Sequence, residues 1–232
     1  VTEIERAHLQ AIAATQGPIL LETQFFRHKP IAEALADAAN RNPHLTCMMI
    51  LPAAPEDVAF YGNRRQDAQL GAQMQMDCID IITQAFEQRL ALASPAQATS
   101  RIEGLDQTAI LHDAPIIYVH SKLSLFGGHE AILSSANLNG RSMRWDTEAG
   151  IHLARPNHVT ALWDAALRHW FPTMPYPDPL ADQLTFIAWV RVELAKNMVT
   201  TPEARPHFLL PFPRGRDTEL AKPVFGVPDE IV

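Results

Sequence analysis

The sequence predicts an α/β fold, a mostly parallel β-sheet with helices on both faces, and three observations support it. Short apolar runs of strand length alternate with longer stretches of helical periodicity. Proline and glycine punctuate the boundaries between these stretches. The 232 residues are enough for one sizeable core, and contents of 47% hydrophobic and 19% charged residues are ordinary for a globular protein.

The first quarter of the chain predicts two helix–strand pairs. Residues 3–15 carry apolar side chains at helical spacing, and Gly17 follows where that helix should end. Ile19–Leu21 is then a short strand. A second helix runs from Lys29 to about Asn40, since proline at its second position is tolerated in a first turn. Leu45–Leu51 is an apolar run that we expect to be a buried strand.

The middle of the chain predicts one long helix and two further strands. Residues 66–92 show helical periodicity throughout. A polar stretch then leads to a strand at Ile116–His120, and a second apolar run, AILS, occupies residues 131–134. Catalytic groups in such sheets gather at strand ends, which is where Glu22 and His120 stand.

The character of the sequence changes after residue 171. Ten of the 18 prolines lie from Pro172 onward, interrupted by one helical stretch at residues 180–198. The run around Phe208 and Phe212 is too apolar for a free linker. We therefore divide the chain into a domain of residues 1–171 and a proline-rich arm of residues 172–232, wrapped over that domain or over a missing partner.

Composition restricts the function classes. A net charge of −7 argues against non-specific nucleic-acid binding, which relies on a basic surface. No run of about 18 apolar residues and no signal peptide is visible, so a soluble chain of open compartment is expected. Cys47 and Cys78 predict buried free thiols rather than a disulfide framework. Four other histidines lack metal-ligand spacing and are expected to be solvated or structural: His28, His112, His129 and His152.

The segment from His120 to Glu148 carries residues suited to phosphodiester chemistry. His120 and Lys122 stand two apart, so on a strand they would point to one face, and Ser135 and Asn137 repeat this spacing. A lysine neutralises phosphoryl charge, while a hydroxyl and an amide hydrogen-bond phosphoryl oxygens. An imidazole attacks phosphorus or shuttles a proton, and Glu148 could accept its second N–H. Together they provide charge, hydrogen bonds and a nucleophile without a metal or cofactor.

This segment resembles the phospholipase D superfamily, whose signature is H-x-K-x4-D followed by a G/S-S-x-N element. Glu148 stands where the family has its acidic partner, and ILLETQFF is similar to the family's site-lining strand, which implies substrate-binding roles for Glu22 and Gln24. The resemblance covers roughly residues 3–171. One departure is Gly127, which replaces the signature aspartate. In the family that aspartate mainly supports local structure.

The resemblance implies a phosphodiesterase that hydrolyses or transfers the phosphatidyl group of phospholipids at a membrane surface. In the family one motif histidine attacks phosphorus and becomes a phosphohistidine, while the other protonates the leaving alcohol. His120 resembles the second-half histidine, which is usually the acid. His120, Lys122 and Glu148 would then be catalytic, and Ser135 and Asn137 would bind substrate.

One motif supplies only half of that histidine pair. The first residues resemble the opening of a second half, which predicts a C-terminal fragment, a proteolytic piece or the product of a split gene. Activity would then need a homodimer or a separate N-terminal first-half polypeptide.

Three alternatives remain open. The first is a nuclease that uses the same residues on DNA or RNA, which the acidic charge disfavours. The second is a cardiolipin-synthase-like phosphatidyltransferase, which differs in its acceptor and not in its site. The third is a degenerate, non-catalytic half, in which Gly127 marks lost function.

Overall fold

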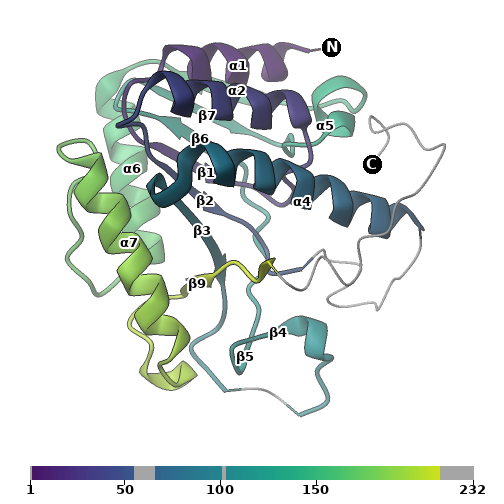
Figure 1. Cartoon of the computed structure of the whole chain (residues 1–232), viewed down its shortest axis with the longest axis vertical. Coiled ribbons are helices and arrows are strands. Elements are labelled where there is room, and N and C mark those ends of the chain that lie inside the picture. The colour runs from purple at the N-terminus through teal and green to yellow at the C-terminus, as the bar shows by residue number, and fades with distance from the viewer. Residues whose placement is uncertain (1, 55–65, 101–102, 215–232) are drawn as a thin grey trace.

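A computed structural model describes residues 2–54, 66–100 and 103–214. Seven strands of this part form one sheet, in the order β8-β7-β6-β1-β2-β3-β9, between two layers of helices (Figure 1). The strands are β1 (Ile19–Glu22), β2 (Cys47–Ile50), β3 (Leu90–Pro95), β6 (Leu123–Phe126), β7 (Glu130–Ser134), β8 (Gly150–Leu153) and β9 (Leu209–Pro211). The helices are α1 (Glu3–Ala14), α2 (Lys29–Arg41), α4 (Gln66–Phe86), α5 (Gly140–Arg144), α6 (Pro156–Trp170) and α7 (Gln183–Met198). A small hairpin stands apart, made of β4 (Ile110–Leu111) and β5 (Ala114–Pro115).

The predicted α/β class, with helices on both faces, is confirmed. The three central strands β1, β2 and β3 run parallel, because α2 and α4 are the crossover connections between them. The flanking strands β6, β7 and β8 alternate in direction on one side, and β9 pairs antiparallel with β3 on the other. The parallel pairing is therefore confined to the three central strands of the sheet.

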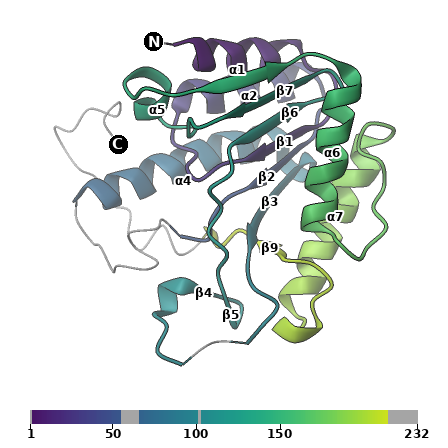
Figure 2. The same cartoon turned by 180° about the vertical axis from the view of Figure 1, so that it is seen from behind.

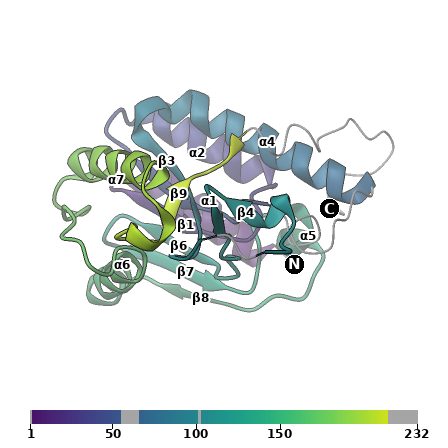
Figure 3. The same ribbon diagram turned by 90° about the horizontal axis from the view of Figure 1, so that it is seen from below.

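Alternating side chains of the strands build two separate cores. Ile19 and Leu21 of β1 pack toward α1, α2 and α4, while Leu20 between them packs toward α6 and α7. β2 divides in the same way, with Met49 on the first face and Met48 on the second. Figures 2 and 3 show α6 and α7 on the face of the sheet opposite to α2 and α4. Both faces are thus buried, which explains the continuous apolar runs in the sequence.

Two element predictions are wrong. The helix expected over residues 66–92 ends at Phe86, and Leu90 opens β3 after a single 3-10 turn. The strand expected at Ile116–His120 is absent from the described structure: Ile116 makes one isolated bridge to Ala96, and the strand of this region is β6, which begins at Leu123. His120 and Lys122 therefore precede a strand and do not lie on one.

The described part of the arm adds a helix and an edge strand to the same sheet. α7 packs its buried face against the second core, and β9 extends the sheet beside β3. Asn197 on α7 ties the two together, because its Nδ2 donates to the carbonyl oxygens of His207 and Leu209 at 2.7 and 2.8 Å. None of the helices in the described ranges combines the length and the apolar character needed to cross a membrane.

Candidate functional site

Four strand ends lie side by side along one edge of the sheet. The carboxyl ends of β1 and β7 and the amino ends of β6 and β8 are neighbours in the register of the sheet. The predicted site residues are placed at these ends: Glu22 and Gln24 at and after the end of β1, His120 and Lys122 before β6, Ser135 and Asn137 after β7, and Glu148 before β8.

Gln24 connects the two motif segments. Its Oε1 accepts a hydrogen bond from Lys122 Nζ at 3.4 Å and another from Asn137 Nδ2 at 3.3 Å. Its Nε2 donates to the hydroxyl of Tyr118 at 2.9 Å. Both bonds to Oε1 are longer than the usual range for N–H···O contacts. An ammonium and an amide therefore share one neutral oxygen that satisfies neither well.

Lys122 is a partly buried cation bonded to neutral oxygens. Besides Gln24, its ammonium donates to the carbonyl oxygen of His120 at 2.8 Å. Burial lowers the pKa of Lys122, and the negative charge of Glu148 opposes that shift. A bound anion would act in the same direction as Glu148 and favour the charged lysine.

Ser135 and Glu148 form the second contact pair of the site. The hydroxyl of Ser135 donates to Oε2 of Glu148 and accepts from the backbone N–H of Ala149 at 3.0 Å. The Ser135 N–H donates to the carbonyl oxygen of Ala149 at 2.9 Å, which joins the two loops. Within the described residues no hydrogen bond connects Glu148 to His120. The carboxylate holds the serine in this structure.

His120 is exposed and lines a cavity of about 370 Å³ at this edge. The cavity lies between the segment before β6 and the last turns of α6, and half of its lining residues are aliphatic. Its other lining residues include Glu22, Leu123, Leu162, Ala165, Ala166, His169 and Trp170. An apolar cavity next to an exposed imidazole has room for an organic group attached to a phosphate.

Glu22 is a buried carboxylate that fixes the His120 segment to α6. Ser121 Oγ donates to its Oε2 and Trp170 Nε1 donates to its Oε1, both at 2.7 Å. The resemblance implied a substrate-binding role for Glu22, and both of its oxygens are occupied by protein donors here. In this structure Glu22 therefore holds Ser121, the residue next to His120, and its substrate-binding role stays a prediction.

Sequence reasoning missed Tyr118 and Trp170. Tyr118 stands two residues before His120, so the same every-second-residue spacing that selected Lys122 could have selected it. Trp170 gave no local signal, because its contact with Glu22 spans 148 residues.

Asn137 has an unused acceptor. Its side-chain oxygen is buried and accepts no hydrogen bond from the described part of the protein, although its amide nitrogen reaches Gln24. Buried polar atoms without a partner are uncommon in folded proteins and carry an energetic cost. A hydroxyl or protonated ligand oxygen at this edge would satisfy it.

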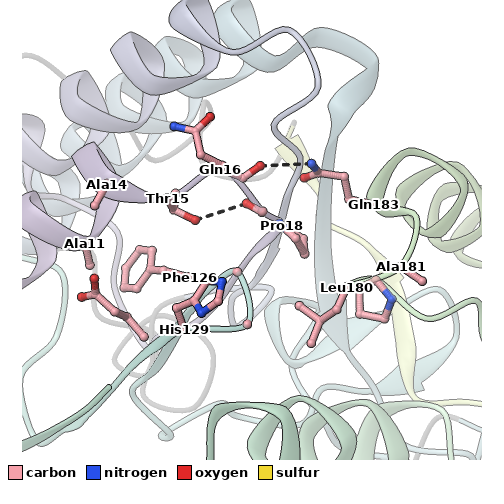
Figure 4. A pocket seen from close by; sticks show the side chains of 15 residues that line it. Ala11, Ala14, Thr15, Gln16, Pro18, Phe126, His129, Leu180, Ala181 and Gln183 are labelled. Atoms are coloured by element: carbon pink, nitrogen blue, oxygen red, sulfur yellow. Dashed lines mark hydrogen bonds between the residues drawn. The ribbon is translucent and has the colours of Figure 1, made fainter. Parts of the chain in front are cut away.

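Gly127 lies at the opposite end of β6 from His120. The four residues of β6, which lie between the two positions, span roughly 13 Å by themselves. Gly127 opens the turn into β7 with φ of +54°, donates from its N–H to the Pro18 carbonyl at 2.8 Å, and accepts from Trp163 Nε1 at 2.8 Å. A cavity of about 530 Å³ adjoins this turn, with His129 beside it (Figure 4). None of the predicted site residues lines that cavity.

The remaining histidines make no metal site in the described structure. No group of three or more His, Cys, Asp or Glu side chains in those ranges is arranged to hold a metal ion. His28 is buried against Glu5, and His152 pairs with Glu130 at 3.0 Å. Cys47 and Cys78 are buried and form no disulfide in the described structure, and burial raises the pKa of Cys47 to about 12.

Comparison with known proteins identifies the family. The family model described as "Cardiolipin synthase, PLD-like domain" matches residues 8–170. No curated protein matches the chain. Similar solved structures include NucT from Helicobacter pylori (TM-score 0.48, 12% identity, 71% of this chain and 85% of that one) and Nuc from Salmonella typhimurium, described as a phospholipase D family member (0.45, 12%, 71% and 84%). Phosphatidylserine synthase from Haemophilus influenzae Rd KW20 is also similar (0.48, 15%, 85% of this chain), and this chain spans 45% of it.

Proposed function

Because the chain belongs to the phospholipase D-like family, we propose that it breaks a phosphodiester at the edge containing His120 and there hydrolyses or transfers the phosphatidyl group of phospholipids. One observation carries this proposal: Lys122 and Asn137, fifteen residues apart, both donate to the same oxygen of Gln24. A phosphate oxygen is a stronger acceptor than an amide oxygen, because it carries charge. The two donors are therefore already aimed at one place where a phosphoryl oxygen can bind.

The proposed reaction has two steps. The imidazole nitrogen of one motif histidine attacks phosphorus, the bond to the leaving alcohol breaks, and the other motif histidine gives that oxygen its proton. Water or a second alcohol then attacks the phosphohistidine, the phosphorus–nitrogen bond breaks, and the attacking oxygen returns a proton to the second histidine. We assign His120 to the proton-transfer role and a motif histidine of a second half to the attack.

Lys122, Ser135 and Asn137 would stabilise the charge that develops on the phosphoryl oxygens. Ser135 is held by Glu148, so its hydroxyl proton is engaged until a stronger acceptor displaces the carboxylate. The cavity beside His120 would take the organic part of the substrate. The family description, cardiolipin synthase, favours an alcohol acceptor in the second step.

Anion binding tests the proposed site without requiring a second half. We expect inorganic phosphate or tungstate to bind the purified chain, and we expect Lys122→Met to weaken that binding about tenfold or more by isothermal calorimetry, since one charge-assisted contact is lost. Lys29→Met, which removes an exposed lysine on α2, is the matched control. Equal affinity in all three proteins would contradict the proposed site.

A turnover assay then separates the substrate classes. Phosphatidylcholine vesicles, the same vesicles with an added alcohol, and plasmid DNA distinguish hydrolysis, transfer and nuclease activity. We expect the lipid arms to react, to lose activity with His120→Asn, and to keep activity in EDTA. Cleavage of DNA and not of lipid would support the nuclease alternative instead. If the assembled protein binds the anion but turns over no substrate, the chain is a non-catalytic half.

A further inference from the structure

A buried cluster of ionisable side chains joins α1, the residue before α2, and α5. The Glu5 carboxylate of α1 is 6% exposed, and its Oε1 accepts from His28 Nε2 at 2.7 Å. The same oxygen accepts from Arg144 Nη2 at 2.9 Å, and Oε2 accepts from Arg144 Nε at 3.3 Å. His28 is 4% exposed and stands just before α2, while Arg144 ends α5. None of these three residues belongs to the site described above.

Within the described residues, the cluster combines a Glu5–Arg144 ion pair with a neutral imidazole. Burial raises the pKa of Glu5, but hydrogen bonds from Arg144 and His28 outweigh it and lower that pKa overall. Burial lowers the pKa of His28, against the opposing effect of Glu5. Glu5 is therefore ionised, and His28 donates its Nε2 proton to it. Such a cluster is costly to break, because the remaining partner is left buried without compensation.

The histidine of this cluster is connected to the loop after β7. The backbone N–H groups of Arg27 and His28 both donate to the carbonyl oxygen of Leu138, at 2.7 and 2.9 Å. Leu138 directly follows Asn137, and its own N–H reaches Thr23 Oγ1 at 3.5 Å. The side chain of His28 thus anchors the backbone that holds Asn137 beside Gln24.

The arginine of the cluster is connected to the other loop of the site. Arg144 is the last residue of α5, and Glu148 follows it by four residues. The views in Figures 1 and 2 agree that α5 lies at the end of α1 and α2. Glu5 therefore contacts both His28, which is connected to the loop after β7, and Arg144, which is connected to the loop before β8.

We propose that Glu5, His28 and Arg144 form a buried brace that positions Asn137 and Glu148. All three would act as positioning residues, because the groups proposed above to bind substrate belong to other side chains. The inference rests on the function proposed for the sheet edge that contains His120. It means that α1, through Glu5, helps to position the site. A misplacement of about 1 Å in a catalytic constellation costs on the order of a hundredfold in rate, so a brace at this point controls activity from a distance.

Amide hydrogen exchange tests the brace without substrate. In Glu5→Gln and in His28→Leu we expect the amides of Ser135 and Ala149, which link the two loops, to exchange at least about tenfold faster. His28→Gln keeps an N–H donor near the position of Nε2 and should stay close to the wild-type rate. The matched control is Glu193→Gln, which removes a carboxylate on α7 that is 5% exposed and paired with Lys196 at 2.7 Å.

Phosphate affinity completes the experiment. We expect Glu5→Gln and His28→Leu to weaken phosphate binding about tenfold or more, and His28→Gln and Glu193→Gln to change it less than twofold. If Glu5→Gln does not fold, comparing the exchange rates and phosphate affinities of His28→Leu and His28→Gln still tests the brace. The brace is refuted if Ser135 and Ala149 exchange no faster in His28→Leu than in Glu193→Gln. A wild-type protein that fails to bind phosphate refutes the proposed function, and the exchange rates still decide the brace.

Discussion

Lys122 is a partly buried ammonium that a bound anion would stabilise. Its ammonium is partly buried, so its pKa is lowered, and its hydrogen bonds go to two neutral oxygens of Gln24 and His120. Lysine next to apolar Leu123 would be costly without a charged partner. Glu148 supplies part of that charge through space, while its own oxygen is occupied by Ser135. A bound phosphate would supply the remaining negative charge beside Lys122. A lysine in full contact with water needs no such partner.

The first prediction concerns His120. Because an acid or nucleophile of phosphoryl transfer cannot be replaced by an amide, we expect His120→Asn to lower kcat about a thousandfold or more, with little change in stability. Steady-state kinetics on the phospholipid substrate measures it. His129→Asn, an exposed histidine at the far end of β6, is the control and should retain activity. Equal losses in both variants would remove His120 from the mechanism.

Gly127 allows the motif aspartate to be restored. Its φ of +54° is left-handed, which costs a non-glycine residue roughly 1 kcal/mol, although aspartate tolerates it better than most. A Cβ there would meet Thr15 Oγ1 at 3.4 Å and Gly17 Cα at 3.5 Å, which leaves space for it. We expect Gly127→Asp to lower the free energy of unfolding by about 1 kcal/mol or less and to leave kcat unchanged. A large gain in kcat, measured beside urea denaturation, would give position 127 a role in catalysis that the roughly 13 Å of β6 argues against.

At the scale of elements, α1 is held to the sheet by a buried histidine. His8 Nδ1 lies 2.8 Å from the Ile4 carbonyl oxygen and Nε2 lies 3.0 Å from Ser124 Oγ of β6. Burial lowers the pKa of His8 to about 4. The folded protein thus keeps His8 neutral where the unfolded chain, with an ordinary pKa near 6.5, already binds a proton.

This gives a prediction for stability against pH. As pH falls from about 6.5 to about 4, the unfolded state gains the proton first, so His8 makes the free energy of unfolding decrease, by up to about 3 kcal/mol. We expect His8→Gln to flatten the decrease over this interval, measured by urea denaturation at several pH values. His44→Gln, an exposed histidine, should keep the wild-type slope. An unchanged slope in His8→Gln would show that the buried imidazole is not what makes the protein acid-sensitive.

The elements also show where sequence reasoning succeeds and where tertiary contacts override it. Helices α1 and α2 were predicted well, because their periodicity and their proline and glycine signals are local. β3 was missed because Leu90 follows Phe86 at a helical spacing of four, and only pairing with β2 makes it a strand. The apolar run before His120 looked like a strand, but the partner edge of β1 is already taken by β6.

The candidate site also contains residues that local sequence patterns predict and residues that only tertiary contacts reveal. His120, Lys122, Ser135, Asn137 and Glu148 were selected from spacing within 29 residues. The structure connects Lys122 and Asn137 through Gln24, and Ser135 with Glu148 directly. The brace residues Glu5 and Arg144 lie 139 residues apart, so no pattern in the sequence could connect them. Their proposed roles follow only from the contacts that the fold creates between α1, α5 and the residue before α2.

At the scale of the whole molecule, the two edges of the sheet differ. β9 covers β3 on one side, whereas β8 ends the sheet on the other and pairs only with β7 among the described strands. Two large apolar side chains are exposed on and before β8: Ile151 is 64% exposed and Trp145 is 70% exposed. Trp145 stands three residues before Glu148, so this surface adjoins the candidate site. Contiguous exposed apolar patches larger than a few hundred Å² mark interaction surfaces, and we expect Trp145 and Ile151 to belong to one.

The last prediction concerns assembly. The chain contains one His-x-Lys motif, while the proposed reaction needs two histidines. We therefore expect the β8 edge to dock a second motif-bearing half, either another copy of this chain or a separate first-half polypeptide. Two-fold or pseudo-two-fold symmetry would then place the two motifs face to face. Light scattering should give twice the 25.8 kDa chain mass, or a stoichiometric complex with the first half.

Variants of the exposed surface make this prediction specific. A tryptophan that becomes buried in an interface is a frequent hot spot. Trp145→Ser should therefore weaken association about tenfold or more and should lower turnover at dilute protein, while leaving phosphate binding intact. Val199→Ser is the control, because Val199 is 82% exposed but follows α7, away from the β8 edge. A chain that stays at 25.8 kDa at every concentration and still hydrolyses the phosphodiester would refute the docking surface and the need for a second histidine together. Association lost equally in both variants would place the contact elsewhere on the molecule.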